Sequence, residues 1–96
     1  MGLDDVFRAL SDPTRREILR MLRKRDMTAG EIADRFPLAK STLSGHFSAL
    51  KQAGLIVPER LGTKIVYSLN VAAHEETVAA ILSVFGVGGR GKGNRQ

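Results

Sequence analysis

Apolar residues recur at helical spacing through most of the chain, beginning close to its start. A first short amphipathic helix is predicted from four apolar positions at i, i+3, i+4 and i+7: Leu3, Val6, Phe7 and Leu10. A second helix is predicted to begin at Pro13, because Asp12 can cap it and proline loses no hydrogen bond at the first helical position. Its predicted buried residues are Ile18, Leu19 and Leu22, with Met21 at the margin. Its predicted exposed residues are basic: Arg15, Arg16, Arg20 and Arg23.

Two further helical patterns follow in the first half of the chain. Thr28 and Glu31 match a capping box for a third helix over residues 28–36. After a tight connection, residues 40–53 are predicted to form a fourth helix, which ends where Gly54 can adopt a left-handed conformation. The buried face of the fourth helix is predicted from residues at helical spacing: Leu43, Phe47 and Leu50.

Beyond the fourth helix the pattern changes to the two-residue period of strands. Residues 56–60 and 65–69 are predicted to be two strands joined by a tight turn. Pro58 is compatible only with an edge strand, which a two-stranded hairpin supplies. Asn70 is expected to cap a last helix over residues 71–85. The predicted fold is therefore mostly α-helical with a small β-hairpin, in the order ααααββα.

The composition favours a globular protein with a polyanionic partner. The 96 residues include 15 Lys or Arg and 10 Asp or Glu, which gives a formal net charge of +5. The absence of cysteine excludes disulfides, cysteine-ligated metals and thiol nucleophiles. No signal peptide and no stretch long enough to span a bilayer is recognised, so a cytoplasmic protein is expected. Residues 1–85 are expected to form one domain, and residues 86–96 a flexible glycine-rich tail that is either a simple chain end or a basic arm touching phosphate.

The fourth helix and the hairpin carry the residues that indicate a function. Two short helices joined by a tight corner and followed by a basic hairpin form a helix-turn-helix with a wing. A recognition helix needs small polar residues on its exposed N-terminal face, because bulky ones would hold it away from base edges in the major groove. The candidate DNA-binding residues on the helix are Lys40, Ser41, Thr42, Ser44, Gly45, His46 and Lys51. Those on the hairpin are Arg60, Thr63 and Lys64.

Other interpretations of these residues stay open. The serine-rich face could simply be solvated, although solvated helix faces usually carry Glu, Lys and Gln. His46 either contacts a phosphate or makes a local hydrogen bond. A winged helix that binds protein would favour aromatic residues and methionine on its contact face, whereas this chain has no Trp and one Tyr. An enzyme is not expected, because His46 and His74 lie on different helices and Ser44 points away from His46.

Three segments of the sequence together resemble the ArsR-type winged helix-turn-helix transcriptional repressors. They are the run from Phe7 to Leu19, the run from Leu43 to Ile56, and Gly62 with the ending Tyr67-Ser68-Leu69-Asn70. The resemblance covers about residues 3–83 and is greatest for the SdpR-like autorepressor branch. It implies a homodimer that binds a palindromic, inverted-repeat operator in double-stranded DNA and represses transcription. It also implies that the helix and hairpin residues named above contact that DNA.

No metal and no other cofactor is expected from the sequence. Metal-sensing members of this family carry a cysteine pair in the third helix, or His and acidic ligands on the last helix. This chain has no cysteine, and its last helix offers only His74, Glu75 and Glu76. An unidentified small molecule or a partner protein that relieves repression remains an alternative to regulation by the protein's own concentration.

The last helix is more apolar than the core of so small a chain requires. Its surplus apolar surface would be exposed unless a second copy covers it, and twofold symmetry would then space two recognition helices about 34 Å apart. The alternative is that this helix only closes the core of the monomer. The candidate dimerisation residues are Leu3, Val6, Phe7, Val78, Ile81, Leu82 and Phe85.

Overall fold

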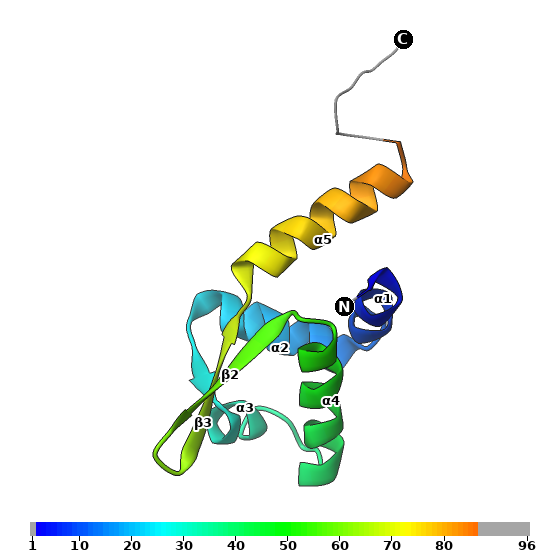
Figure 1. Ribbon diagram of the computed structural model, residues 1–96. Coiled ribbons are helices and arrows are strands. Elements are labelled where there is room, and N and C mark those ends of the chain that lie inside the picture. Colours follow the sequence, from blue (N-terminus) through cyan, green and yellow to red (C-terminus); the bar gives the residue numbers. More distant parts are fainter. Residues whose placement is uncertain (1, 87–96) are drawn as a thin grey trace.

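Residues 2–86 of the chain are described by a computed structural model, and they form helices and strands in nearly the predicted order (Figure 1). The elements are α1 (Leu3–Leu10), α2 (Pro13–Lys24), β1 (Met27–Thr28), α3 (Ala29–Ala33), α4 (Lys40–Gln52), β2 (Ile56–Leu61), β3 (Lys64–Leu69) and α5 (Val71–Val84). The mostly α-helical fold with a β-hairpin wing is confirmed, with β1 as an additional strand. The predicted tail over residues 86–96 lies outside the described part of the chain, except for Gly86.

Local side-chain chemistry sets where the helices begin. Asp12 caps α2, and Pro13 is the first residue of that helix, as predicted. The capping box at α3 is also confirmed: the N–H of Glu31 donates to Oγ1 of Thr28 at 3.0 Å, and the N–H of Thr28 donates to Oε1 of Glu31 at 2.8 Å. Asn70 accepts from the third residue of α5 at 3.2 Å. Three of the five helices thus begin at a side chain that accepts from their free N–H groups.

The C-terminal end of α4 depends on a glycine in the left-handed region. Gly54 has a φ of 74°, its N–H donates to the carbonyl of Lys51 at 2.9 Å, and the N–H of Leu55 donates to the carbonyl of Leu50 at 3.0 Å. These two bonds form a Schellman motif, which satisfies carbonyls that the helix leaves free. The motif turns the chain sharply from α4 into β2.

Replacing Gly54 with alanine is expected to lower the free energy of unfolding by about 1–2 kcal/mol, because a Cβ disfavours this φ. The matched control is Gly30→Ala within α3, where a Cβ would meet its nearest neighbour, Oγ1 of Thr28, at an ordinary 3.9 Å. The control is expected to be neutral or slightly stabilising, because alanine favours helix. Urea unfolding followed by circular dichroism measures both, and equal stabilities for the two variants would contradict the prediction.

The wing is a three-stranded antiparallel sheet in the order β1-β3-β2, not the predicted two-stranded hairpin. Tyr67 in the central strand β3 pairs with Met27 on one side and with Pro58 on the other. Because β2 is an edge strand, Pro58 is tolerated there, as predicted. The other difference is α3, which ends at Ala33 and continues to Phe36 only as turns with i to i+3 hydrogen bonds.

The core lies between the helices and one face of the sheet. Its largest fully buried side chains are Ile18, Ile32, Leu50 and Val6. The predicted buried face of α4, formed by Leu43, Phe47 and Leu50, is confirmed. On α2 the prediction was wrong in two places, because Met21 is buried and Leu19 is only half-buried.

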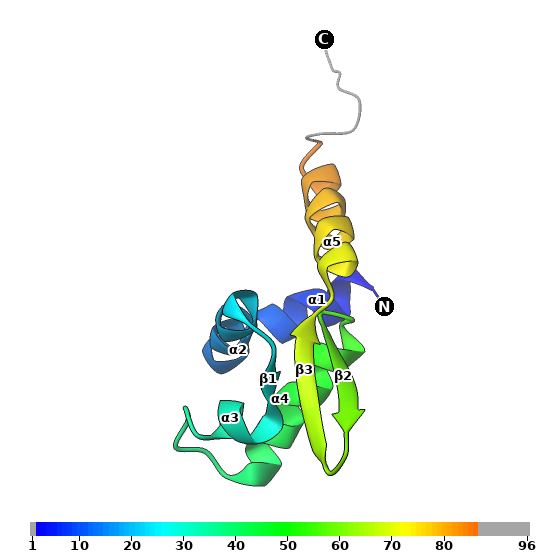
Figure 2. The same cartoon turned by 90° about the vertical axis from the view of Figure 1, so that its left-hand side faces the viewer.

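Helix α5 extends from the end of β3 away from the rest of the described chain (Figures 1 and 2). It packs against α1, and Ala73 is its only buried residue. Two half-buried residues, Thr77 and Ala80, face α1 on the same side as Ala73. Within residues 2–86, no helix is long and apolar enough to cross a membrane. Most of the surface of α5 is therefore uncovered in a single copy of the chain.

Candidate nucleic-acid interface

The small polar residues of α4 lie on its exposed face, opposite the core. Ser41, Thr42, Ser44 and Gly45 are all exposed, as are Lys40, Ser48 and Lys51. The N-terminal end of α4 and the turn of the β2–β3 hairpin lie at the same end of the molecule, and α5 lies at the opposite end (Figures 1 and 2). The fold thus places the predicted residues at the start of α4 and those of the hairpin at one end of the molecule, although they lie apart in the sequence.

The first turn of α4 also exposes backbone donors. Its N-cap residue is Ala39, which has no polar side chain to accept from the N–H groups that begin the helix. Free N–H groups and the positive end of the helix dipole favour an anion such as a phosphate. This feature was not predicted from the sequence, although an alanine at the cap position of a helix is a visible signal of it.

Gly45 is not explained by packing inside the chain. A Cβ at this position would meet no atom of the described structure within 4 Å, and glycine within a helix costs about 0.5–1 kcal/mol relative to alanine. Glycine at an open position of an exposed face allows another molecule to approach the backbone closely. The neighbouring serines have the same effect to a smaller degree, since their side chains are short.

The hairpin presents its basic residues at and beside its tip. Arg60, Thr63 and Lys64 are all exposed, and Lys64 pairs with Leu61 next to the two-residue turn. Gly62 in that turn has a φ of 64°, which glycine adopts without strain. The hairpin can therefore carry positive charge to a polyanion that contacts the N-terminal end of α4.

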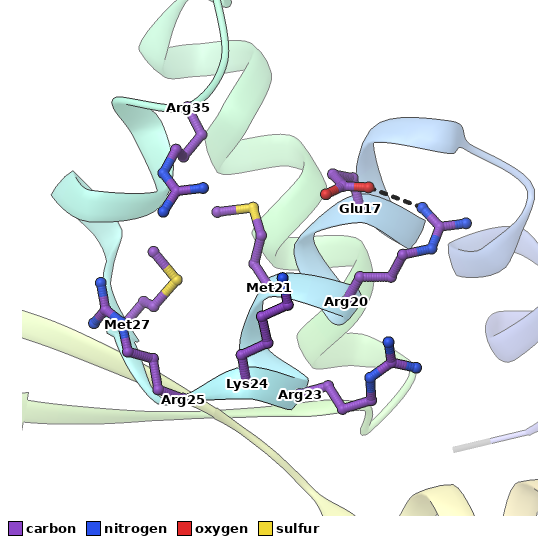
Figure 3. Close-up of a pocket in the computed structure, with 8 residues that line it drawn as sticks. All are labelled: Glu17, Arg20, Met21, Arg23, Lys24, Arg25, Met27 and Arg35. Carbon is purple, nitrogen blue, oxygen red and sulfur yellow. Dashed lines mark hydrogen bonds and ion pairs between the residues drawn. The ribbon is translucent and has the colours of Figure 1, made fainter.

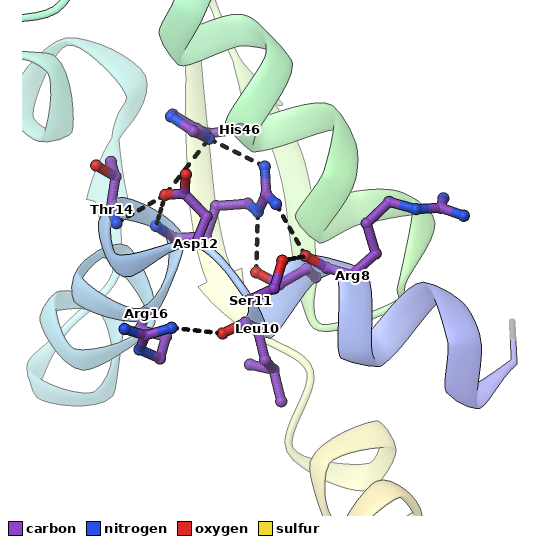
Figure 4. A network of polar contacts seen from close by, with 9 residues as sticks. Arg8, Leu10, Ser11, Asp12, Thr14, Arg16 and His46 are labelled. Atoms are coloured by element: carbon purple, nitrogen blue, oxygen red, sulfur yellow. Dashed lines mark hydrogen bonds and ion pairs between the residues drawn. The ribbon is translucent and has the colours of Figure 1, made fainter.

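Two interactions hold α4 in position. The ring of Phe47 stacks on the ring of Tyr67 in β3, with centroids 4.6 Å apart, and burial raises the pKa of the Tyr67 hydroxyl. The second interaction is made by Arg15 of α2, which connects three elements (Figure 4). Nε donates to the carbonyl of Ala9 at 2.9 Å, Nη2 donates to that of Arg8 at 2.8 Å, and Nη1 contacts Nδ1 of His46 at 3.2 Å. These contacts join the end of α1 to the middle of α4.

The structure distinguishes the two roles predicted for His46 and corrects the predicted exposure of Arg15. His46 is half-buried with only 12% of its side chain exposed, so the local hydrogen bond describes it better than a phosphate contact. Because a guanidinium group only donates, Nδ1 of His46 is the accepting nitrogen in this geometry, and Asp12 at 4.0 Å is too distant for a hydrogen bond. Arg15 is half-buried and not exposed, since its donors satisfy the carbonyls that end α1.

Asp12 supports the same junction. Burial raises the pKa of its carboxyl, but the backbone N–H groups of Arg15 and Thr14 lower it more, with help from His46 and Arg15, so that the pKa lies below its ordinary value. A carboxylate with a lowered pKa contributes stability that is present above its unfolded pKa of about 3.9 and is lost as the pH falls through the folded value.

We therefore expect Asp12→Asn to cost less stability at low pH than at pH 7. Asparagine still caps a helix but does not titrate, so the difference in free energy of unfolding from the unchanged chain should shrink as the pH falls below about 4. Urea unfolding at pH 7, 4 and 3 gives this difference directly. A difference that stays constant over this range would show that the charge of Asp12 is not what stabilises the junction.

The candidate dimerisation residues divide into exposed and buried positions. Phe7 is exposed, and on α5 the exposed fractions are 56% for Val78, 40% for Leu82 and 74% for Phe85. Leu3 and Ile81 are half-buried. Val6 is only 2% exposed and lies in the core, so it positions α1 and offers no free surface.

The possible metal ligands on α5, which are His74, Glu75 and Glu76, do not form a metal site in the described residues. Nε2 of His74 donates to the carbonyl of Leu55 at 2.9 Å and so ties the start of α5 to the loop after α4. In the part of the chain that the structure describes, no three His, Cys, Asp or Glu side chains come together in a group that could hold a metal ion.

Comparison with known proteins assigns this arrangement to a family. A helix-turn-helix domain model matches residues 10–59, which include α2, α3, α4 and most of β2. The solved structure of an ArsR-like transcriptional regulator from Rhodococcus sp. RHA1 superposes with a TM-score of 0.74 at 37% identity, over 88% of this chain and 78% of that one. The chain belongs to the ArsR family of winged helix-turn-helix transcriptional regulators.

Within this family the chain is similar to the transcriptional repressor SdpR of Bacillus subtilis (strain 168). The two are 43% identical over 86 residues, which cover 90% of this chain and 96% of that protein. The arsenical resistance operon repressor of Staphylococcus xylosus is 34% identical over 68 residues, 71% of this chain and 65% of that protein. Membership of this family makes the chain a DNA-binding regulator and not an enzyme, as the sequence predicted.

Proposed function

We propose that this protein is a sequence-specific repressor that binds double-stranded DNA as a homodimer on an inverted-repeat operator. The observation that carries the proposal is the common position of the small polar face of α4 and the basic turn of the hairpin. Ser41, Thr42 and Ser44 would contact base edges in the major groove, with Gly45 permitting close approach. Lys40, Lys51, Arg60, Thr63 and Lys64 would contact phosphates, which set the register on the duplex.

The exposed side of α5 supports the homodimer. Val78, Leu82 and Phe85 form an apolar stripe at helical spacing, and the face that packs on α1 is a different one, formed by Ala73, Thr77 and Ala80. A second copy related by a twofold axis would cover the stripe and would place two recognition helices on successive turns of the major groove. In this assignment residues 1–85 both bind DNA and dimerise, and the protein acts in the cytoplasm.

The simplest regulation consistent with these residues is autorepression without a metal or thiol sensor. The similarity to SdpR supports repression as the outcome of DNA binding. The hydrogen bond from Nε2 of His74 to the carbonyl of Leu55 supports a structural role for the one histidine of α5. The protein would then repress its own gene by binding the upstream DNA once its concentration is high enough.

Fluorescence anisotropy with a labelled duplex tests this function. The duplex carries the DNA upstream of the protein's own gene, a scrambled duplex of equal length is the control, and both are measured across a salt series. We expect the upstream duplex to bind at least about 10³-fold more tightly, as specific regulators do. Equal and steeply salt-dependent binding to both would contradict autorepression, and a genome-wide site selection would then look for an operator elsewhere. Binding to neither would favour a protein-binding winged helix.

A further inference from the structure

A second group of basic residues lies away from the proposed DNA-binding face. A cleft of about 220 Å³ is bounded by the C-terminal half of α2, the start of β1 and the turns after α3. Five of the side chains that line it are cations: Arg20, Arg23, Lys24, Arg25 and Arg35. The single acidic residue in the lining is Glu17, and no residue of α4 or of the β2–β3 hairpin contributes to it. The proposed contacts with DNA therefore leave this group of charges unexplained.

Most of the positive charge of this cleft has no partner within residues 2–86. Glu17 pairs with Arg20 at 2.9 Å, and Arg25 pairs with Glu31 at 3.4 Å. The side chains of Arg23, Lys24 and Arg35 make no hydrogen bond or ion pair in the part of the chain described. Like charges gathered around one concave surface repel each other, and a bound anion would remove that repulsion.

The floor of the cleft is apolar. The thioether side chains of Met21 and Met27 occupy its centre, with Arg35 on the α3 side and the α2 cations on the other side (Figure 3). Both methionines are buried, at 7% and 3% exposed, so the floor excludes water from one side of a ligand. Ion pairs at such a boundary are stronger than in bulk water.

We propose that this cleft binds a small ligand that carries phosphate groups. Guanidinium groups match phosphate oxygens with paired donors, and Lys24 adds a mobile point charge. The volume is below the roughly 300–1,000 Å³ of most small-molecule sites, so the ligand is compact, such as a pyrophosphate or a phosphorylated metabolite with a short carbon skeleton that contacts the methionines. Because Lys24 lies on α2 and Arg35 follows α3, the ligand would bridge the first helix of the helix-turn-helix to the core.

The phosphate groups of DNA could also bind these cations. The geometry of the cleft favours the small ligand. These cations line a cleft of about 220 Å³ with a buried floor, and no residue of α4 or of the hairpin belongs to that lining. The proposal does not depend on the proposed function, because ligand binding is measured without DNA.

Isothermal titration calorimetry with pyrophosphate tests the site at ionic strength held constant with potassium chloride. The test variant is Lys24→Gln with Arg35→Gln, and its matched control is Arg60→Gln with Lys64→Gln on the hairpin, which removes the same charge. We expect saturable binding of one pyrophosphate per chain, at least about tenfold weaker in the test variant and unchanged in the control. Pyrophosphate should also raise the unfolding temperature of the unchanged chain but not of the test variant.

Affinity for a DNA duplex, measured in phosphate-free buffer on the same three proteins, distinguishes the two sources. The hairpin variant should lose DNA affinity while the cleft variant keeps it, the reverse of the pyrophosphate result. Equal weakening of pyrophosphate binding in both variants would overturn the proposal, because net charge alone would then explain it. No saturable pyrophosphate binding, together with a loss of DNA affinity and a smaller salt slope in the cleft variant, would overturn it too and assign the cleft to DNA. Failure of the proposed function would instead appear as no specific DNA binding by any of the three proteins.

Discussion

A monomer in place of a dimer is the expected result of replacing Val78 and Leu82 together with glutamate. The two side chains are 56% and 40% exposed in a single chain and lie one helical turn apart on α5. If a second copy covers them, each glutamate would have to leave water inside an apolar contact, where no cation of α5 faces it. If the two side chains are only solvated, the substitution leaves the oligomeric state unchanged.

The same variant should lose affinity for a palindromic duplex by about 10²-fold or more. Two linked recognition helices bind far more tightly than one, because the second contact becomes intramolecular once the first is made. The residues of α4 are unchanged, so a half-site duplex should bind the variant and the monomeric form of the unchanged chain alike.

Sedimentation velocity measures the oligomeric state, and fluorescence anisotropy measures the DNA affinity. Ser83→Glu is the matched control, since it adds a carboxylate to an exposed position on another side of the same helix. The control should remain a dimer, and circular dichroism should show the same helix content in both variants. A double-glutamate variant that sediments as a dimer would contradict the assignment of this stripe to the interface.

The helices could be predicted from the sequence because each has a local signal. Asp12 before Pro13, the pair Thr28 and Glu31, and Asn70 each mark the start of a helix through side-chain oxygens that accept from free N–H groups. Gly54 marks the end of α4 for an equally local reason. Periodicity then gives the buried face of α4, because three apolar residues at helical spacing can face the core together.

What could not be predicted depends on contacts between distant segments. β1 has only two residues, too few to show a period, and it exists because Met27 pairs with Tyr67 forty residues later. Arg15 was grouped with the exposed arginines of α2 because it is charged, and only the approach of α1 and α4 gives it three partners. The basic cleft likewise requires α2, β1 and the turns after α3 to meet.

The exposure of most candidate site residues could be predicted because they are grouped in two short segments. An exposed run of small polar residues on one helix and three basic or polar residues on one hairpin need only a common orientation, which the fold supplies. His46 belongs to the same run but faces α2, because its position on the helix is nearer to the buried side than those of its neighbours. Sequence proximity to a binding face therefore does not place a side chain on it.

Thr42→Ala and Ser44→Ala should each reduce the discrimination between the operator and a scrambled duplex by about 1–3 kcal/mol, if α4 reads base edges. Both side chains are exposed, and alanine is the better helix former, so these variants should fold at least as stably as the unchanged chain. Lys64→Ala should behave differently, because a phosphate contact carries no sequence information. It should weaken binding to both duplexes alike and lower the slope of log affinity against log salt by about 1.

Anisotropy titrations of the three variants against both duplexes over a salt series separate these two effects. Ser83→Ala is the matched control, since it removes an exposed hydroxyl from the last turn of α5, and this helix lies at the opposite end of the molecule from the hairpin turn (Figure 1). If Thr42→Ala and Ser44→Ala weakened both duplexes equally, α4 would hold the backbone and not the bases, and specificity would have to come from DNA shape. If Thr42→Ala and Ser44→Ala weakened binding to the operator alone, and Lys64→Ala weakened binding to both duplexes, the two elements would have different roles. Helix α4 would then select the sequence, and the hairpin would hold the protein on the duplex.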